Sequence, residues 1–285
     1  MNIQNCLGFL LLFGVVLSPA VKAQELDLNR KNLTFLATFD KSLNADYGLG
    51  EIKQFRAEDV SRKKVEPEKP IEGVSAYPQG KFGGAIDFKK KTKNTFCYKA
   101  AKNFPYSKKE FDVTITFWMK TDPTQLPKGF IDPLQITDKK WNDASIFVDF
   151  NDQRPADFRL GVFSDLKFWN PDNRDFNKMK PEDRPMIDAG KVKFDQDQWM
   201  HVGLVLDDLN TDGKTSLCEF YLDGRRVGQL ARKQKFTWEI NNAYIMLGIY
   251  FIGQIDDFAI FDKALTADQI QAIAKAPDSI STILK

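Results

Sequence analysis

The sequence predicts an all-β domain that ends in one short helix. Short runs in which apolar and polar residues alternate, or in which apolar residues crowd together, recur along the chain between turn residues. Asp223-Gly224, inside LCEFYLDGRRVGQL, is typical of a tight β-hairpin. A helical pattern is convincing only near the C-terminal end. These three observations favour a domain built mainly from strands.

The predicted strands share a length of four to eight residues and a boundary of turn-forming residues at each end. In chain order they are residues 33–39, 84–88, 95–98, 113–119, 145–150, 158–163, 200–206, 216–222, 244–249 and 254–261. Three intervals between them are long: residues 41–81, 121–142 and 164–191. The first includes VEPEKPIEGVSAYP, which we do not expect to form a regular element. Loops of this length are usually functional or disordered.

The predicted helix follows the last strand within residues 253–273, GQIDDFAIFDKALTADQIQAI. Thr266 is placed to cap its N-terminus, with Gln269 three residues later as the second member of a capping box. Ile270 and Ile273 then lie on one apolar face. We therefore expect a capped amphipathic helix packed against the strands.

The first 23 residues have the pattern of a secretory signal peptide. The apolar run at 7–17 is too short to span a bilayer, and small residues lead to a cleavage site between Ala23 and Gln24. The alternative is an uncleaved membrane anchor. We divide the chain into a signal peptide (1–23), an N-terminal tether (24–31), one domain (32–276) and a C-terminal tail (277–285). Nothing after the leader is apolar enough to cross a membrane, so we expect an exported protein that is extracellular, on the cell surface or periplasmic.

Charge and cysteine content narrow the possible partners. Lys and Arg number 41 against 39 Asp and Glu, a balance that predicts no nucleic-acid partner. Cys6 belongs to the leader, leaving Cys97 and Cys218. In an exported protein these two form either one disulfide or two separately buried thiols, and the sequence leaves both open.

Several segments together resemble the laminin G-like, concanavalin A-like lectin/glucanase jelly-roll family. They are FLATFDKSLNAD, GKFGGAIDF, the pair FDVTITFWMKT and DQWMHVGLVLD, YLDGRRVG, and the closing GQIDDFAIFDKALTADQI, in that order along residues 34–276. The resemblance implies an antiparallel two-sheet jelly-roll β-sandwich, with six or seven strands in each sheet and the chain ends meeting on one strand pair. The family includes lectins, hydrolases, lyases and adhesion modules, so the fold does not select a function.

The sequence carries no recognised catalytic motif. Jelly-roll glycosidases of the laminarinase type place Glu-x-Asp-x-x-Glu on one strand, but after Glu110 and Asp112 the third position here is Ile115. Asp149 is the next-best polar candidate, and a hydrolase would have to draw its second acid from a loop residue such as Asp165 or Asp172. The single histidine, His201, lies in a strand and is expected to be structural.

A structural calcium ion is a further expectation from the resemblance. Many jelly rolls of this kind bind calcium where the first strand meets the last, and the matching residues here are Asp40 and Asp256. Calcium takes six to eight oxygen ligands, so backbone carbonyls and water would complete the shell. The alternative is that Asp256 and Asp257 accept backbone N–H groups at turns.

Carbohydrate binding requires exposed aromatic faces with hydrogen-bonding groups around them. Trp141, Trp169, Phe168 and Asn170 lie in the long polar intervals and, with Asp149, are the candidate ligand-binding residues. Trp238 also lies in a polar turn region, whereas Trp118 and Trp199 are assigned to the core. The alternative is that the loop tryptophans only cover the ends of the sandwich.

The function we predict is a secreted or cell-surface, non-catalytic module that recognises a glycan or another surface polymer. Two alternatives stay open: a polysaccharide-degrading hydrolase of the jelly-roll type, and an adhesion or scaffold domain that binds a protein. The ligand, the oligomeric state and any attachment to the envelope are not determined by the sequence.

Overall fold

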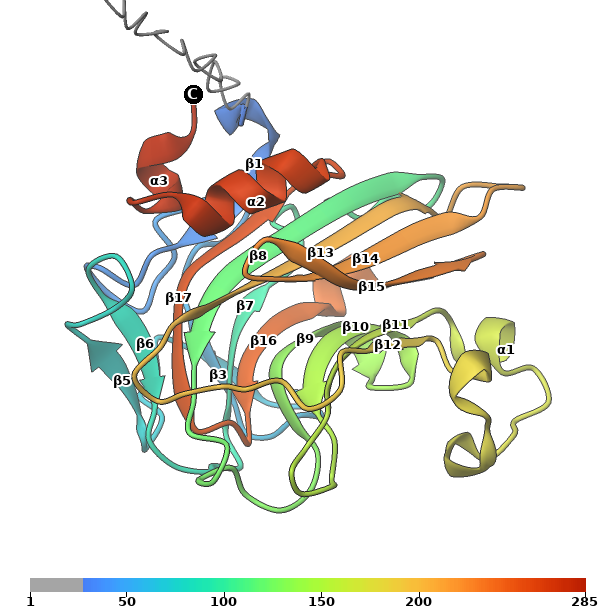
Figure 1. Ribbon diagram of the computed structural model, residues 1–285, viewed down its shortest axis with the longest axis horizontal. Helices are drawn as coiled ribbons and strands as arrows, with labels where there is room; N and C mark the ends of the chain where they lie inside the picture. Colours follow the sequence, from blue (N-terminus) through green and yellow to red (C-terminus); the bar gives the residue numbers. More distant parts are fainter. Residues whose placement is uncertain (1–27) are drawn as a thin grey trace, which may run out of the picture.

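The computed structural model describes residues 28–285, which form two antiparallel sheets packed face to face (Figure 1). The predicted signal peptide and the first half of the predicted tether, residues 24–27, lie outside the described residues. Within residues 28–285 no helix is long and apolar enough to cross a membrane. The predicted all-β jelly-roll sandwich is confirmed.

The first sheet, which we call sheet A, carries the N- and C-terminal strands. Its main order is β15-β14-β13-β8-β17-β1-β2, and β6 pairs with both β17 and β5. The bounds are β1 (Leu33–Ala37), β2 (Tyr47–Gly48), β5 (Val74–Tyr77), β6 (Ala85–Phe88), β8 (Phe111–Lys120), β13 (Met200–Leu209), β14 (Ser216–Leu222), β15 (Arg225–Arg232) and β17 (Gly253–Phe261).

The second sheet, sheet B, has the order β12-β11-β10-β9-β16-β7-β3-β4. The bounds are β3 (Phe55–Ala57), β4 (Val65–Pro67), β7 (Thr95–Lys99), β9 (Ile131–Lys140), β10 (Asp143–Phe150), β11 (Phe158–Phe163), β12 (Met186–Asp188) and β16 (Tyr244–Ile249). The sheets contain nine and eight strands, more than the six or seven expected, because short strands extend their edges.

The main core lies between the two sheets, as side-chain alternation requires. In β10, for example, Ile146, Val148 and Phe150 belong to this core, while Phe147 and Asp149 lie on the opposite, outer face of sheet B. Leu160 and Val162 of β11 likewise point inward. Each strand of sheet B therefore presents its alternate residues to the outer face.

The helices are short and lie outside the sandwich. They are α1 (Leu166–Trp169), α2 (Ala267–Lys275), α3 (Ile280–Ile283) and the 3₁₀ turns η1 (Arg30–Asn32), η2 (Phe176–Lys178), η3 (Pro181–Asp183) and η4 (Ile240–Asn242). The predicted capping box of α2 is present: Thr266 Oγ1 accepts from the Gln269 backbone N–H, and the Gln269 side chain accepts from the Thr266 N–H. Figure 1 shows α2 lying across the outer face of sheet A, where Ile270 and Ile273 are buried.

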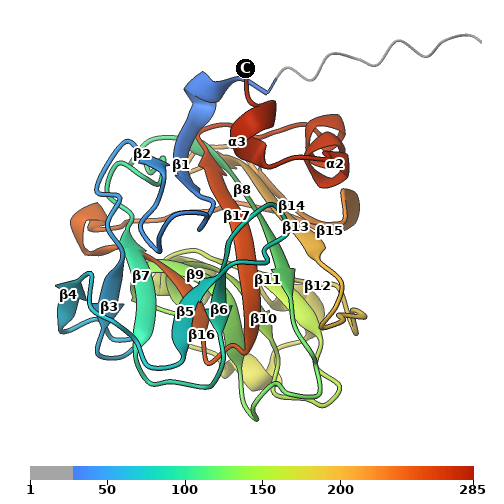
Figure 2. The same ribbon diagram turned by 90° about the vertical axis from the view of Figure 1, so that its left-hand side faces the viewer.

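The two ends of the described chain meet on this same side of the molecule (Figure 2). β1 pairs with β17, as the resemblance implied, and the Lys285 backbone N–H donates to the Leu28 carbonyl at 2.9 Å. Ile280, within the predicted tail, is buried. Residues 277–285 are therefore packed onto the sandwich.

The structure corrects three expectations about local structure. Residues 121–142 hold β9, a central strand of sheet B, which Pro133 and the charges around it conceal in the sequence. The segment VEPEKPIEGVSAYP contains β4 and β5. Trp199 precedes β13 and is only partly buried, so it is not a core residue, whereas Trp118 is buried.

Candidate functional site

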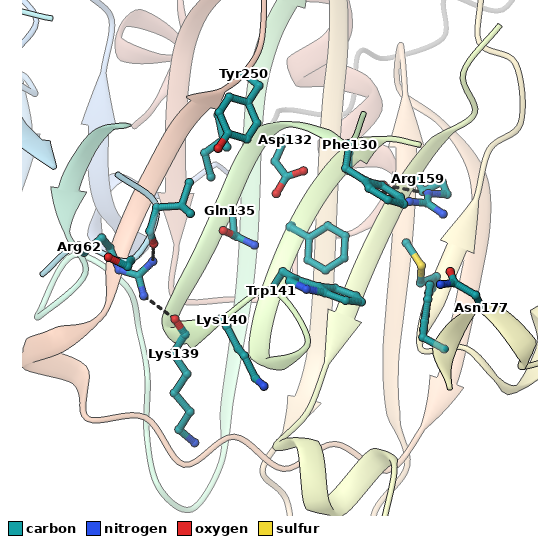
Figure 3. A pocket seen from close by; sticks show the side chains of 17 residues that line it. Arg62, Phe130, Asp132, Gln135, Lys139, Lys140, Trp141, Arg159, Asn177 and Tyr250 are labelled. Atoms are coloured by element: carbon teal, nitrogen blue, oxygen red, sulfur yellow. Dashed lines mark hydrogen bonds and ion pairs between the residues drawn. The ribbon is translucent and has the colours of Figure 1, made fainter. Parts of the chain in front are cut away.

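A cavity of about 520 Å³ opens on the outer face of sheet B (Figure 3). β9 contributes Asp132, Gln135, Lys139 and Lys140, β10 contributes Phe147 and Asp149, and β11 contributes Arg159. The walls come from the turn at residues 60–62, from Trp141 between β9 and β10, from Phe176 and Asn177 of η2, from Met186 of β12, from Ile249 at the end of β16, and from Tyr250 after it. Phe130, directly before β9, completes the rim.

The aromatic side of the cavity rests on a packed cluster. Trp141 is 44% exposed, and its ring meets Phe163 and Phe176 edge-on at centroid distances of 5.7 and 5.5 Å. Phe147 stacks on Phe163 at 5.3 Å. A Cβ at Gly161 would lie 2.3 Å from the Phe147 ring, so glycine is what lets this ring lie flat on the sheet. The indole of Trp141 is thus held in place while one part of it faces solvent.

The floor of the cavity contains a buried ion pair. Arg159 Nε donates to Asp149 Oδ1 at 2.9 Å, and Arg159 Nη2 donates to Asp149 Oδ2, a two-pronged pairing. Both side chains are buried, and the guanidinium lies 5.6 Å from the centre of the Phe130 ring. In Figure 3, Phe130 and Arg159 lie together on one side of the cavity and Arg62 lies on the other. Because Asp149 uses both oxygens on Arg159, it holds that cation in a fixed position.

Two carboxyl groups of the floor have perturbed pKa values. Burial raises the pKa of Asp149 to about 6, although the hydrogen bonds from Arg159 oppose the shift. Burial also raises the pKa of Asp132 well above its ordinary value, and the charge of Asp149 adds to this effect.

The sequence-predicted ligand residues are only partly brought together. Trp141 and Asp149 both line the cavity. Trp169 is 8% exposed and donates through Nε1 to the Asn142 carbonyl at 3.0 Å, so its ring is part of the packing beneath the 164–191 segment. Phe168 is exposed but does not line the cavity, and Asn170 is buried and bonded to the backbone of Arg174. Trp238 is also buried.

Sequence reasoning missed Asp132, Gln135, Arg159, Phe130 and Arg62. The first two lie on the unrecognised strand β9. Arg159 had a usable signal, because β10 and β11 form a hairpin in which Arg159 stands directly opposite Asp149. A lone arginine across from a lone aspartate on two apolar strands indicates a buried ion pair.

The structure does not assemble the acid pairs considered for a hydrolase. Asp165 accepts from the backbone N–H and hydroxyl of Thr237 and does not line the cavity, and Asp172 is exposed elsewhere. The second acid in the cavity with Asp149 is Asp132.

The remaining nucleophiles and bases lie apart from the cavity. His201 is buried with no hydrogen-bond partner for either ring nitrogen, and burial lowers its pKa to about 3. Cys97 and Cys218 are separately buried free thiols, and burial raises the pKa of each to about 12. Thiols held in this way are unreactive.

Asp40 and Asp256, the candidate calcium ligands, both contact the 80–84 segment. The Gly84 N–H donates to Asp40 Oδ1 at 2.7 Å, and the Phe82 N–H donates to Asp256 Oδ2 at 2.9 Å. Burial raises the pKa of Asp256 to about 8, with Asp257 as a second cause, and neither Asp40 nor Asp256 has an ion-pair partner in the described chain. The two side chains offer only oxygen atoms, the ligand type that calcium prefers. Both oxygens of Asp256 also accept backbone N–H groups, from Phe82 and Asp257, as the alternative expected. The calcium site stays a prediction.

One other carboxylate group within residues 28–285 is compact enough to consider for a metal ion. Oxygens of Asp112, Asp207 and Asp208 lie within 4.8 Å of one another. Lys214 Nζ is 2.8 Å from Asp208 Oδ1, and the Asp208 N–H donates to Asp112 at 2.9 Å. Because the Lys214 ammonium and a backbone N–H already bind oxygens of this cluster, we assign no metal ion to it.

Comparison with known proteins supports the description of the fold. The family model Laminin_G_3, described as the concanavalin A-like lectin/glucanases superfamily, matches residues 98–271. No sequence among curated proteins is similar enough to count as a match.

Solved structures with a similar fold share little sequence with this chain. Domain 4 of AbnA, an extracellular GH43 arabinanase from Geobacillus stearothermophilus, solved with arabinotriose, is 16% identical, with a TM-score of 0.54 over 86% of this chain and 98% of that one. The binding domain of botulinum neurotoxin DC, solved with SialylT, is 12% identical with a TM-score of 0.55, covering 87% of this chain and 52% of its own. A botulinum neurotoxin type C structure is 14% identical with a TM-score of 0.54, covering 86% and 51%. The chain thus spans about half the length of these toxin chains, and identities this low show the fold alone.

Proposed function

Because the chain belongs to the concanavalin A-like lectin/glucanase superfamily, we propose that it is a non-catalytic binding module that holds a saccharide in the cavity on the outer face of sheet B. One observation carries the proposal: the half-exposed indole of Trp141 borders a cavity whose floor is polar and fixed. A sugar ring needs an apolar face to stack on and hydrogen-bonding groups at its rim.

The residues around Trp141 supply both requirements. Phe130 also lines the cavity, is 49% exposed and offers a second aromatic surface. Gln135 and Asn177 line the cavity, and none of their side-chain groups has a hydrogen-bond partner among residues 28–285. The volume of about 520 Å³ is within the range of ligand pockets.

Ligands of proteins with this fold support a saccharide as the occupant. Domain 4 of AbnA was solved with arabinotriose, and entry of botulinum neurotoxin type C into cells depends on two ganglioside molecules. These ligands belong to those proteins, and at such low identity they do not select a particular sugar for this chain.

A hydrolase is the second candidate, favoured by the presence of two carboxyl groups, Asp132 and Asp149, in one cavity. A glycosidase needs one protonated acid and one free carboxylate on either side of the scissile bond. Asp149 does not have a free carboxylate, because both of its oxygens bind Arg159. This pairing is the physical reason to prefer binding over catalysis.

Binding of the protein to a broad glycan and polysaccharide array, with released sugar measured for every hit, tests both candidates. The expected result is a hit without product that weakens in Trp141→Ala. Product release that disappears in Asp149→Asn would establish the hydrolase instead. Silence across the array would refute saccharide binding and favour a protein partner, the third alternative.

We also propose that the protein works outside the cytoplasm. The support is the sequence of residues 1–23, which has the apolar run and small-residue cleavage site of a signal peptide. The intact mass of the protein recovered from its native host tests this, because cleavage before Gln24 predicts a defined N-terminus.

A further inference from the structure

The charges that line the cavity do not balance. Four basic side chains and two acidic ones line it, although the whole chain carries 41 basic and 39 acidic residues. They are Arg62, Lys139, Lys140 and Arg159 against Asp132 and Asp149. An excess of positive charge confined to a concave site points to the charge of its ligand.

Two of the four cations are already neutralised. Arg159 is paired with Asp149. Lys139 Nζ lies 3.3 Å from Asp165 and 3.8 Å from Asp143, outside the cavity. Neither of these cations requires a charged ligand.

Arg62 and Lys140 have no carboxylate partner within residues 28–285. Arg62 is partly buried, and its guanidinium donates to the carbonyls of Val60 at 2.6 Å and Lys139 at 2.8 Å. These bonds fix the cation at one side of the cavity, next to the backbone of Lys140 (Figure 3). The guanidinium bonds only to neutral groups, and the charge of Asp138 acts on it without forming an ion pair, so the cation is still available to a ligand.

The floor adds one hydrogen-bond donor that is still available to a ligand. Arg159 uses Nε and Nη2 on Asp149, while its Nη1 makes no hydrogen bond with the described residues and is not fully buried. A ligand rich in acceptor oxygens satisfies this group.

We infer that the saccharide bound in this cavity carries an acid group, a carboxylate or a sulfate ester, held on the side formed by Arg62 and Lys140. This inference rests on the proposed function and names its ligand class. Both acid groups present planar or clustered anionic oxygens that a guanidinium and an ammonium bind well.

Paired probes that differ only in charge test the inference. Calorimetry compares oligogalacturonate with its methyl ester for the carboxylate arm, and dextran sulfate with dextran for the sulfate arm. The acidic member of at least one pair should bind at least about tenfold more tightly than its neutral twin, since a charged hydrogen bond is lost in the twin. Raising the ionic strength should weaken this binding. The pair in which the acidic probe binds more tightly than its neutral twin identifies the recognised group as a carboxylate or a sulfate.

Variants locate the contact on the protein. Lys140→Gln should weaken binding of the acidic probe about threefold to tenfold, and should weaken any binding of the neutral twin less. Lys263→Gln is the matched control, because Lys263 is an exposed lysine that follows β17 on sheet A and does not line the cavity. Arg62 is not the first choice, because its guanidinium also ties the 60–62 turn to β9.

The outcomes separate the inference from the proposed function. Equal binding of charged and neutral twins, both weakened by Trp141→Ala, would overturn the inference and keep the saccharide site. An equal loss of affinity for the acidic probe in Lys140→Gln and Lys263→Gln would also overturn the inference. The probe would then be attracted by the overall charge of the protein and not by the cavity. Absence of binding to these probes and to every glycan on the array would overturn both.

Discussion

Trp141 and Trp169 should respond in opposite ways when each is replaced by alanine. Trp169 is 8% exposed, its ring lies 5.0 Å from that of Phe163, and its Nε1 bonds to a backbone carbonyl. Removing a buried tryptophan costs about 3–5 kcal/mol of unfolding free energy. Trp141 is 44% exposed, so slightly more than half of its surface is buried by packing, and the cost of removing it scales to about 1.7–2.8 kcal/mol.

The effects on binding should run the other way. Trp141 presents its free face to the cavity, and loss of a stacking platform should weaken binding of an array hit by about 1–2 kcal/mol, or roughly 5- to 30-fold. Trp141→Phe keeps an aromatic face and should retain part of the affinity. Trp169→Phe should be folded and bind almost normally, because the ring it replaces does not reach the cavity.

Urea denaturation measures the stability differences, and calorimetry with the array hit measures affinity for each folded variant. If folded Trp141→Ala bound as tightly as the wild type, Trp141 would not be the stacking platform and the site would have to be sought elsewhere. If Trp169→Ala were as stable as the wild type, its role as a packing residue beneath the 164–191 segment would be wrong.

Other predictions concern the buried polar groups. Arg159→Met should lower the free energy of unfolding by about 3–5 kcal/mol because it leaves the buried Asp149 carboxylate unpaired, and the double change with Asp149→Leu should recover most of that loss in urea denaturation. Burial lowers the pKa of His201 from 6.5 to about 3, so the unfolded chain takes up this proton first and stability is lost as the pH falls below about 6.5. His201→Phe should therefore flatten the dependence of the melting temperature on pH between about 6.5 and 4, and an unchanged profile would contradict this. Added calcium should raise the melting temperature and a chelator should lower it; no shift with either would exclude the site at Asp40 and Asp256.

Local sequence was sufficient for the strands that have a regular pattern. In β10, β11 and β14, apolar residues either alternate with polar ones or form a continuous run. The capping box of α2 lies within four consecutive residues, 266–269. β9 was not recognised because Pro133 and Asp132 interrupt its apolar residues at the point where its register with β10 shifts. Such irregularity is tolerated in the structure because the strands on both sides hold β9 in place.

The site was less predictable than the fold, for a related reason. Trp141 could be proposed because an aromatic residue in a polar segment is unusual, but Trp169 gave the same signal and is buried. What separates them is packing of the 164–191 segment against β11, which no local pattern encodes. Arg62 enters the cavity from a turn between two short strands, with a φ of 55°, and only tertiary contacts bring it beside β9.

The location of the cavity follows from which sheet face is covered. The outer face of sheet A is covered by α2 and by both ends of the described chain, which bury Leu33, Val205 and Phe261 in a second core. On the outer face of sheet B, α1 packs at one side through Trp169, and within residues 28–285 no helix crosses β9. The turn at residues 60–62 and the 164–191 segment stand at opposite sides and leave parts of β9, β10 and β11 accessible. Buried polar residues are costly on a strand unless they are paired or face a ligand. Asp149 and Arg159 satisfy this condition by pairing with each other. The side chain of Gln135 and the Nη1 group of Arg159 find hydrogen-bond partners only when water or a ligand fills the cavity. The polar residues of these strands are therefore best explained by the requirements of binding, since an apolar pair in place of Asp149 and Arg159 would serve stability at least as well.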